Sequence, residues 1–153
     1  MAVKIQLKRF DELSKKELYR LLQMRAEIFI KEQQCPYLDP DNKDVSAWHV
    51  LMKNPDEKII GYARIFPPGA YLPGATAVGR VSVDRTYRKR GLAYRIMDKS
   101  IGFLKEKFPG YPVEISAQSY LIGFYQNLGF VQVSNEYLED GLPHVRMKLY
   151  FHS

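Results

Sequence analysis

The segment from residue 77 to residue 117 constrains the fold more than any other part of the chain. Residues 77–83 (AVGRVSV) and 113–117 (VEISA) have the length and composition of strands. Between them, residues 91–108 repeat apolar or small side chains at helical spacing, and Pro109-Gly110 ends that helix. A strand, a helix and a second strand predict a crossover connection, which makes the two strands parallel neighbours in one sheet.

The rest of the chain predicts antiparallel strands and two further helices. Ser14-Lys15-Lys16-Glu17 forms a capping box, in which the first and last side chains bind each other's backbone N–H groups, so a helix is expected over residues 15–30. The dipeptide Asp140-Gly141 is typical of a tight hairpin turn. The other expected elements are strands at residues 3–9, 47–52, 59–66, 131–139 and 144–151 and a short helix at 120–128.

Together these elements predict an α/β (α+β) fold with one domain over residues 1–153. We expect a mixed, mostly antiparallel sheet of six to seven strands, with a central parallel pair and helices on both faces. A chain of 153 residues supports one full core without disulfide or metal staples. Residues 31–44 contain two prolines and are expected to form a long loop, and long ordered loops are often functional.

Composition excludes several other classes of protein. Hydrophobic residues make up 46% and charged residues 26% of the chain, as in ordinary globular proteins and unlike disordered or collagen-like chains. No run reaches the roughly 18 consecutive apolar residues of a membrane span, and the first residues lack the apolar stretch of a signal peptide. Because Cys35 is the one cysteine, no internal disulfide can form, and cytoplasmic localisation is expected.

Positive charge is concentrated in one segment. The net charge is +6, and residues 84–99 hold six basic and two acidic residues. A localised surplus favours one anionic ligand over a long polyanion. A nucleic-acid-binding protein is the alternative, but the chain shows no recognition helix, zinc-ligand spacing or RNA-stacking motif. We therefore expect neither nucleic acid nor a membrane as a partner. No metal is expected either, because His49, His144 and His152 lack metal-ligand spacing.

This basic segment lies where a strand enters a helix. The first N–H groups of a helix have no intrahelical partners, and Gly91 and Ala93 leave room for an anion to reach them. Arg88, Lys89 and Arg90 would add positive charge. The pattern predicts a phosphate site, and a solvated helix start with basic residues is the alternative interpretation.

A second informative segment, residues 118–130, begins at the carboxyl end of the strand expected at 113–117. Ligands bind outside the carboxyl ends of strands in open α/β sheets, so this segment is placed where a ligand is expected. Taken singly, Phe124, Tyr125 and Phe130 would be assigned to the core, with the Tyr125 hydroxyl reaching water.

Taken together, the two segments resemble the GNAT superfamily of acyl-CoA-dependent N-acyltransferases. The helix-capping signature of that family matches Arg88-Lys89-Arg90-Gly91-Leu92-Ala93, and a later signature matches Tyr125 followed by Gly129-Phe130. The order of the expected elements matches as well. A narrower resemblance, to the ElaA-type branch, rests on residues 32–37 (EQQCPY), 61–65 (GYARI), 79–81 (GRV) and 139–144 (EDGLPH). One departure is Asp41-Asn42, where that branch more often has Asp-Gly; asparagine also tolerates a left-handed turn.

The resemblance implies direct transfer of an acetyl group from the co-substrate acetyl-CoA to an amine. It implies that backbone groups of Val81 and Val83 pair with the pantetheine arm and that the N–H groups of residues 90–93 bind the pyrophosphate. A backbone N–H near Val81 would stabilise the oxyanion, and Tyr125 would protonate the departing sulfur, since a phenol is protonated at neutral pH. The implied acyl-CoA site is Val81, Ser82, Val83, Arg88, Lys89, Arg90, Gly91, Leu92, Ala93, Gln118 and Phe124.

The acceptor amine is mostly protonated at pH 7, so a base or a water path must take a proton from it. The sequence leaves open which of the candidate bases acts: Glu32, Asp39, Asp41, Asp44, His49 or Glu114. The expected acceptor pocket comprises Glu32, Cys35, Tyr37, His49, Arg64 and Arg80. For His49 a buried structural role is the alternative, and Cys35 with His49 can be drawn as a thiol nucleophile pair.

Two arginines interrupt apolar strands, Arg64 and Arg80. Either they pair with acids or face solvent, or they line the acceptor cleft and select an acceptor that carries a carboxylate or phosphate. Strand alternation predicts that Arg80 and Ser82 share one face, opposite the other residues of 79–83.

The leading interpretation is an N-acetyltransferase that uses acetyl-CoA and acts on a small-molecule or peptide amine, as a monomer or a homodimer. The alternative is a catalytically inactive CoA-binding regulatory module, because the sequence would not reveal a missing base. Release of CoA on addition of amines separates the two.

Overall fold

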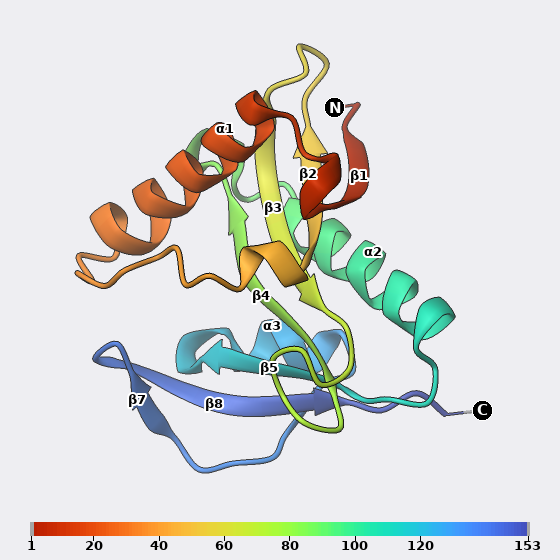
Figure 1. The fold of residues 1–153 in the computed structure, drawn as a ribbon. Coiled ribbons are helices and arrows are strands. Elements are labelled where there is room, and N and C mark those ends of the chain that lie inside the picture. The colour runs from red at the N-terminus through yellow and green to blue at the C-terminus, as the bar shows by residue number, and fades with distance from the viewer. Residues whose placement is uncertain (1, 153) are drawn as a thin grey trace.

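The computed structural model describes residues 2–152, and its core is one mixed sheet (Figure 1). Within those residues the sheet has eight strands in the order β1-β2-β3-β4-β5-β8-β6, with β7 paired to β8. The strands are β1 (Lys4–Arg9), β2 (Trp48–Lys53), β3 (Ile59–Phe66), β4 (Thr76–Val83), β5 (Val113–Gln118), β6 (Val131–Gln132), β7 (Tyr137–Glu139) and β8 (Leu142–Leu149). The helices are α1 (Lys15–Arg25), α2 (Leu92–Lys107) and α3 (Ile122–Asn127).

The predicted parallel pair is β4 and β5, and every other pairing in the described sheet is antiparallel. The two parallel strands are in register only at Thr76 with Val113 and at Ala77 with Glu114. Beyond these pairs the strands separate, which Figure 1 shows as a widening gap between β4 and β5. The backbone edge of β4 that would have faced β5 is therefore left without a strand partner over residues 78–83.

Helices cover both faces of the sheet, as the alternation of the strands requires. On one face Leu51 and Tyr62, which are register partners, pack with Leu21 and Met24 of α1. On the other face α2 packs so closely that a Cβ atom at Gly61 would lie 2.6 Å from Cδ1 of Ile96. Glycine at this strand position is thus what allows α2 to approach the sheet.

The stretch 131–139 differs from the single strand that was expected. It contains two short strands, β6 and β7, so the described sheet has eight strands rather than six to seven. The ladder with β8 breaks at Ser134, whose side-chain Oγ accepts the N–H of Arg146 at 2.8 Å in place of a backbone carbonyl. This side-chain contact, which the periodicity does not encode, interrupts the strand.

The first helix also differs from the expected span of residues 15–30. The capping box is confirmed, since Ser14 Oγ accepts the N–H of Glu17 at 3.0 Å and the Glu17 carboxylate accepts the N–H of Ser14 at 2.8 Å. The α-helical spacing ends at Arg25, and residues Ala26–Glu32 continue as a wider π-helical segment. Segments of this kind are rare and often occur at functional sites.

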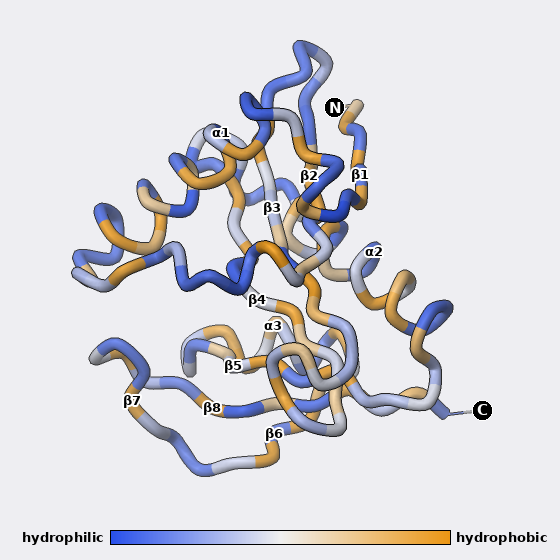
Figure 2. The backbone as a smooth tube through the Cα atoms, in the orientation of Figure 1, coloured by the Kyte–Doolittle hydropathy of each residue, from blue (hydrophilic) through white to orange (hydrophobic). Residues whose placement is uncertain are grey.

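Apolar residues concentrate in the strands and on the inner faces of the helices, whereas the loop after the π-helical segment is hydrophilic (Figure 2). In the described part of the chain, no helix has the length and apolar character that crossing a membrane requires.

Candidate functional site

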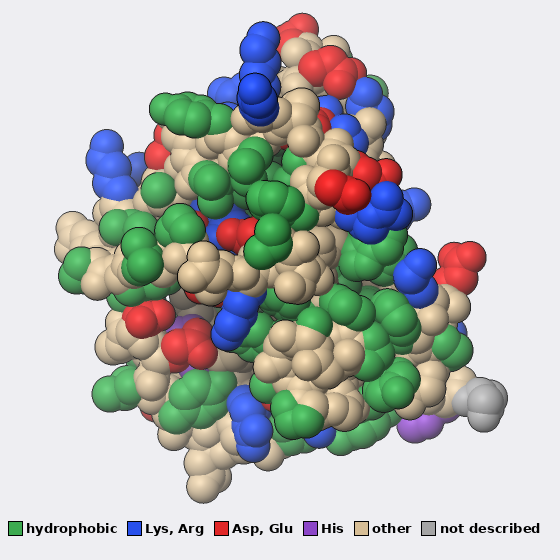
Figure 3. Space-filling model, viewed as in Figure 1, with side chains coloured by type: hydrophobic (Ala, Val, Ile, Leu, Met, Phe, Trp, Pro, Cys, Tyr) green, Lys and Arg blue, Asp and Glu red, His purple; other side chains and the backbone are tan. Residues whose placement is uncertain are grey.

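A cavity of about 750 Å³ opens between the separated strands β4 and β5. Its walls also come from the start of α2, from α3, from the β7–β8 hairpin and from the segment after α1. Figure 3 shows basic, acidic and histidine side chains along a hollow in this face of the molecule. The hollow lies between the part that contains α1 and the part that contains β5, β7 and β8 (Figure 1). The separation of two parallel neighbours thus opens a cavity at the centre of the sheet, next to the carboxyl ends of the strands.

Nearly all the residues expected in the acyl-CoA site and the acceptor pocket line this one cavity; Arg90 and His49 do not. Those lining it are Tyr125, Val81, Ser82, Val83, Arg88, Lys89, Gly91, Leu92, Ala93, Gln118, Phe124, Glu32, Cys35, Tyr37, Arg64 and Arg80. The fold thus joins segments separated by up to about ninety residues into one site.

The start of α2 forms one wall. Gly91 is the residue before the helix and has a φ of 72°, a left-handed conformation that favours glycine. A Cβ atom at Gly91 would meet nothing within 4 Å, so the space over the first turn is open. The N–H groups of this turn have no intrahelical partners. An anion such as a pyrophosphate can reach them from the cavity.

The basic side chains beside this turn are used differently from one another. Arg88 donates from both terminal nitrogens to the Glu32 carboxylate, and its Nε donates to the Val83 carbonyl at 3.0 Å. The bond from Arg88 holds the pKa of Glu32 below its usual range. Arg88 therefore shares its charge with Glu32, and the Val83 carbonyl already accepts one hydrogen bond.

The other two basic residues of this segment lie differently. The guanidinium of Arg90 lies 5.5 Å from the centre of the Tyr87 ring. Lys89 is exposed at the cavity edge.

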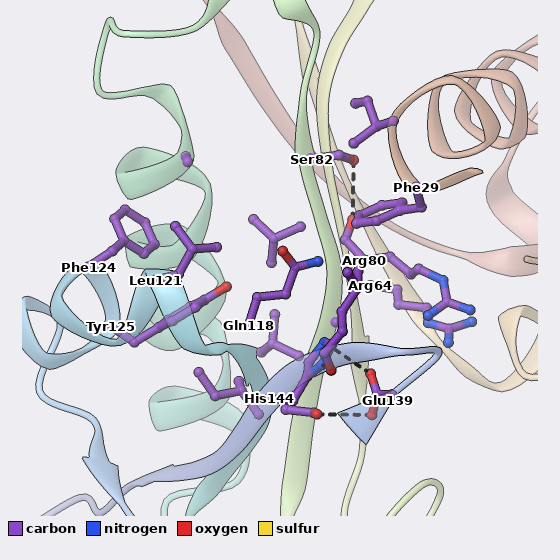
Figure 4. Close-up of a pocket in the computed structure, with 18 of the residues that line it drawn as sticks. Phe29, Arg64, Arg80, Ser82, Gln118, Leu121, Phe124, Tyr125, Glu139 and His144 are labelled. Carbon is purple, nitrogen blue, oxygen red and sulfur yellow. Dashed lines mark hydrogen bonds and ion pairs between the residues drawn. The ribbon is translucent and has the colours of Figure 1, made fainter. Parts of the chain in front are cut away.

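Tyr125 stands on α3 with its hydroxyl directed into the cavity, toward Gln118 (Figure 4). Its ring makes edge contacts with Phe124, at 5.0 Å between centroids, and with Phe130, at 5.8 Å. Among the described residues the hydroxyl has no hydrogen-bond partner. Burial raises the pKa of Tyr125 to about 12, so the hydroxyl keeps its proton at neutral pH. The ring of Tyr125 thus packs in the core, while its hydroxyl is a proton donor that faces the cavity.

A β-bulge in β4 shapes the centre of the site. Tyr62 pairs with Ser82, but Arg64 pairs with Gly79, so β4 carries one extra residue between these pairs. Arg80, at the bulge, has a φ of 52°. Because paired residues share a face, Gly79 lies on the same face as Ser82, and the expectation that the two lie on opposite faces was wrong. The bulge breaks the alternation on which that expectation depended.

Arg64 and Arg80 both line the cavity, and both are paired with acids. Arg64 is 2% exposed and bridges Asp41, at 2.7 Å, and Asp44, at 3.0 Å. Arg80 Nε donates to Asp39 at 2.9 Å. These pairings match the interpretation that the strand arginines bind acids. Because their charge is compensated, they offer little net attraction to an anionic acceptor.

Two of these aspartates are tied to α1 by a third arginine, Arg25, which is fully buried at the end of that helix. It donates to Asp39 at 2.9 Å and to Asp44 at 2.8 Å. Burial alone raises the pKa of Asp41 and of Asp44, but the hydrogen bonds from the arginines outweigh it and hold both below their usual range. Carboxylates held ionised in this way are weak proton acceptors at pH 7.

His49 does not reach the cavity. It is fully buried, with Nδ1 2.6 Å from the Tyr62 hydroxyl and Nε2 2.8 Å from the Asp44 carbonyl. Burial lowers the pKa of His49, which favours the neutral ring. His49 therefore has the buried structural role that was the alternative interpretation. The thiol pair of Cys35 with His49 does not form.

The segment after the π-helical turn crosses the cavity. Cys35 donates to the Asp140 carbonyl at 2.9 Å, and Gln118 donates to Gln33 at 3.2 Å. The ring of Tyr37 lies 5.5 Å from the Arg80 guanidinium. Two hydrogen bonds thus join this segment to the strands on the far wall, so the cavity is partly roofed.

Sequence reasoning missed a second polar group on the far wall. Ser116, Tyr137, Glu139 and His144 all line the cavity and contact one another. A signal was present, because the turn at Asp140-Gly141 places Tyr137 opposite His144. Of the candidate bases, Glu114 also lines the cavity, with Lys148 Nζ 3.6 Å from its Oε1.

No group of three or more His, Cys, Asp or Glu side chains among residues 2–152 is arranged to hold a metal ion.

Comparison with known proteins agrees with this geometry. A family model described as an acetyltransferase (GNAT) domain matches residues 23–151. The protein ElaA of Escherichia coli is 38% identical over 139 residues, which cover 90% of each chain.

Two crystal structures superpose on nearly the whole chain. An acyl-CoA N-acyltransferase from Pseudomonas aeruginosa has a TM-score of 0.91 and 33% identity, and E. coli ElaA has a TM-score of 0.90 and 35% identity. In both cases the superposition covers 97% of this chain and 99% of the other.

Proposed function

Since the chain belongs to the GNAT acetyltransferase family, in its ElaA-type branch, we propose that it transfers an acetyl group from acetyl-CoA directly to an amine. The protein acts as a cytoplasmic, single-domain enzyme on a small-molecule or peptide amine, as a monomer or a homodimer. The family supports acyl-CoA-dependent N-acyl transfer, and the choice of acetyl and of the amine is the proposal.

The acyl-CoA substrate lies between β4 and β5. Its pantetheine amides pair with the free backbone edge of β4 at residues 81–83, as an added strand would. Its pyrophosphate meets the open N–H groups at Gly91 and the following residues. Lys89 adds positive charge there. The fit of an extended arm and a diphosphate to one continuous wall supports acyl-CoA over a simple phosphate.

One observation carries the chemistry. The Tyr125 hydroxyl faces the cavity without a hydrogen-bond partner among residues 2–152, and it holds its proton at neutral pH. The amine nitrogen attacks the thioester carbon, a backbone N–H near Val81 stabilises the oxyanion, and the C–S bond breaks as Tyr125 protonates the sulfur. The proton that the nitrogen loses on forming the amide replaces the one that Tyr125 gave up. No covalent enzyme intermediate forms.

The test measures binding and turnover with purified protein. Acetyl-CoA at 100 times its dissociation constant should stabilise the fold by about 2.7 kcal/mol. Release of CoA is then followed across primary amines, amino acids and peptides, with acetyl-CoA compared against longer acyl-CoAs. Turnover with an amine supports the proposal.

Two other outcomes are informative. A thermal shift without CoA release from any amine would support the inactive CoA-binding module instead. The absence of a shift at millimolar acetyl-CoA would remove the assignment of the site.

A further inference from the structure

The far wall of the cavity holds a chain of polar side chains from three strands, in which hydrogen bonds join Tyr137, Ser116 and Glu139 and an ion-pair contact joins Glu139 to His144. The Tyr137 hydroxyl lies 2.5 Å from Ser116 Oγ, and Ser116 Oγ donates to Glu139 Oε1 at 3.0 Å. The other carboxylate oxygen, Glu139 Oε2, lies 3.4 Å from His144 Nε2. The ring of Tyr137 also stacks on the imidazole, with 6.2 Å between centroids. Figure 4 shows His144 and Glu139 meeting at the cavity wall.

The partners determine where the protons can sit. His144 Nδ1 lies 2.8 Å from the Leu142 carbonyl, which can only accept, so Nδ1 carries a hydrogen. Nε2 is then the nitrogen that faces the Glu139 carboxylate, which also only accepts. When a proton arrives at Nε2, the ring has a carbonyl acceptor at Nδ1 and a carboxylate in ion-pair contact at Nε2, so both N–H groups have a partner.

We propose that His144, supported by Glu139, takes the proton from the acceptor amine, an inference that rests on the proposed function. The ammonium N–H bond breaks, its electron pair stays on nitrogen for attack on the thioester carbon, and the proton moves to His144 Nε2. Glu139 balances the charge of the imidazolium. The Glu139 side chain is 46% exposed, so the proton leaves to solvent through the open side of the hairpin.

The other acidic groups of the site are poorly suited to this step. Glu32 and Asp39 are bound to arginines, as are the other aspartates of the loop. Glu114 is ion-paired with Lys148 at 3.6 Å. His49 is buried away from the cavity. His144 is the described histidine that lines it.

A change of charge at His144 takes place among several ionisable groups. Glu139 and Tyr137 of β7 contact the ring directly. The other ionisable groups that line the same cavity nearby are Arg146 of β8, Asp140 of the turn and Tyr37 of the crossing segment, and Glu114 of β5 lies further along the β5–β8 ladder, paired with Lys148. Of these, Glu139 makes the ion-pair contact with the ring, so removal of its charge should destabilise the imidazolium form of His144.

The experiment compares His144→Gln and Glu139→Gln with wild type and with His152→Gln, an exposed histidine outside the cavity. kcat is measured against pH with the amine of highest turnover from the screen. His144→Gln should lower kcat at pH 7 by roughly 10²–10⁴ and remove the fall in rate at acidic pH. Glu139→Gln should lower kcat less and move the acidic limb to lower pH, because the imidazolium loses its counter-charge. His152→Gln should match wild type.

Two further readouts separate this proposal from a structural role and from failure of the proposed function. The thermal shift caused by acetyl-CoA should be unchanged in both cavity variants, and hydroxylamine, an acceptor that is neutral at pH 7, should suffer a smaller loss. An active wild type whose pH profile survives His144→Gln overturns the role of His144 alone. A wild type without turnover overturns both proposals.

Discussion

Arg80 and Asp39 form an ion pair across the site, with Arg80 Nε 2.9 Å from Asp39 Oδ1. The other oxygen of the same carboxylate, Oδ2, accepts from Arg25 at 2.9 Å. One aspartate thus joins the bulge of β4 to the end of α1, and it anchors the loop between them. The loop that contains Asp39 and borders the cavity is held by ionic hydrogen bonds rather than by apolar contacts. Substitution of one of the arginines therefore tests how much these bonds stabilise the fold.

Replacing Arg25 by methionine should destabilise the fold strongly. The side chain is fully buried, and its loss leaves Asp39 and Asp44 with fewer partners in a site that excludes water. Removal of one member of a buried pair costs about 3–5 kcal/mol. Urea unfolding should show this as a lower midpoint with an unchanged slope. Lys4→Met, which breaks the exposed pair with Glu57, is the matched control and should leave the midpoint unchanged.

Tyr125→Phe should reduce turnover while leaving the fold and acetyl-CoA binding intact. The hydroxyl has no partner among the described residues, so its removal costs no protein hydrogen bond, and the ring contacts with Phe124 and Phe130 stay. Loss of a proton donor lowers kcat by roughly 10²–10⁴, and the lower end is expected because a thiolate is a tolerable leaving group. Tyr19→Phe, at an exposed tyrosine on α1, is the control. Full activity in Tyr125→Phe would exclude the hydroxyl from the mechanism.

Gly91→Asp should abolish acetyl-CoA binding. The carboxylate would enter the open space over the first turn of α2 and repel the pyrophosphate. The change also carries a backbone cost, because Gly91 has a φ of 72°. Gly74→Asp is matched for that cost, since Gly74 has the same φ and equally open surroundings but lies outside the cavity. Calorimetric titration should give wild-type affinity for Gly74→Asp; comparable binding by Gly91→Asp would place the anion elsewhere.

Glu17 should make stability depend on pH in the acidic range. Burial by itself raises the pKa of Glu17, but hydrogen bonds from Lys53, at 2.7 Å, and from Lys8 outweigh it, and the pKa falls to about 2. A carboxyl whose pKa is lower in the folded than in the unfolded chain stabilises the fold above the unfolded value, about 4.3. That contribution is lost as the pH falls from about 4.3 toward 2.

The measurement is the free energy of unfolding of wild type and Glu17→Gln from pH 7 to pH 2. The difference between them should be largest and constant above about pH 5 and should shrink below it. A difference that stays constant down to pH 2 would contradict the ion pairs as its source.

Local features of the chain could be predicted because neighbouring residues decide them. The capping box at Ser14 and Glu17 formed as expected, and the turn at Asp140-Gly141 adopts positive φ at both residues. The strand–helix–strand segment produced the parallel pair, and Gly91 is the left-handed residue before α2. The capping box, the turn and the conformation of Gly91 depend on residues within a few positions of one another. The parallel pair joins distant residues, but it follows from the order strand, helix, strand, which allows one crossover connection.

What the tertiary structure decided is the set of contacts between distant segments. Arg80 could have selected an anionic acceptor, and only the folded chain brings Asp39 within 2.9 Å of it. His49 and His144 look alike in the sequence, yet one is buried behind the loop and the other lines the cavity beside Glu139. The sequence by itself determined the elements, their order and the signatures at Gly91 and Tyr125, because these depend on local spacing. Which charges are neutralised and which histidine meets the cavity depends on distances in space, and the separation of β4 from β5 sets those distances.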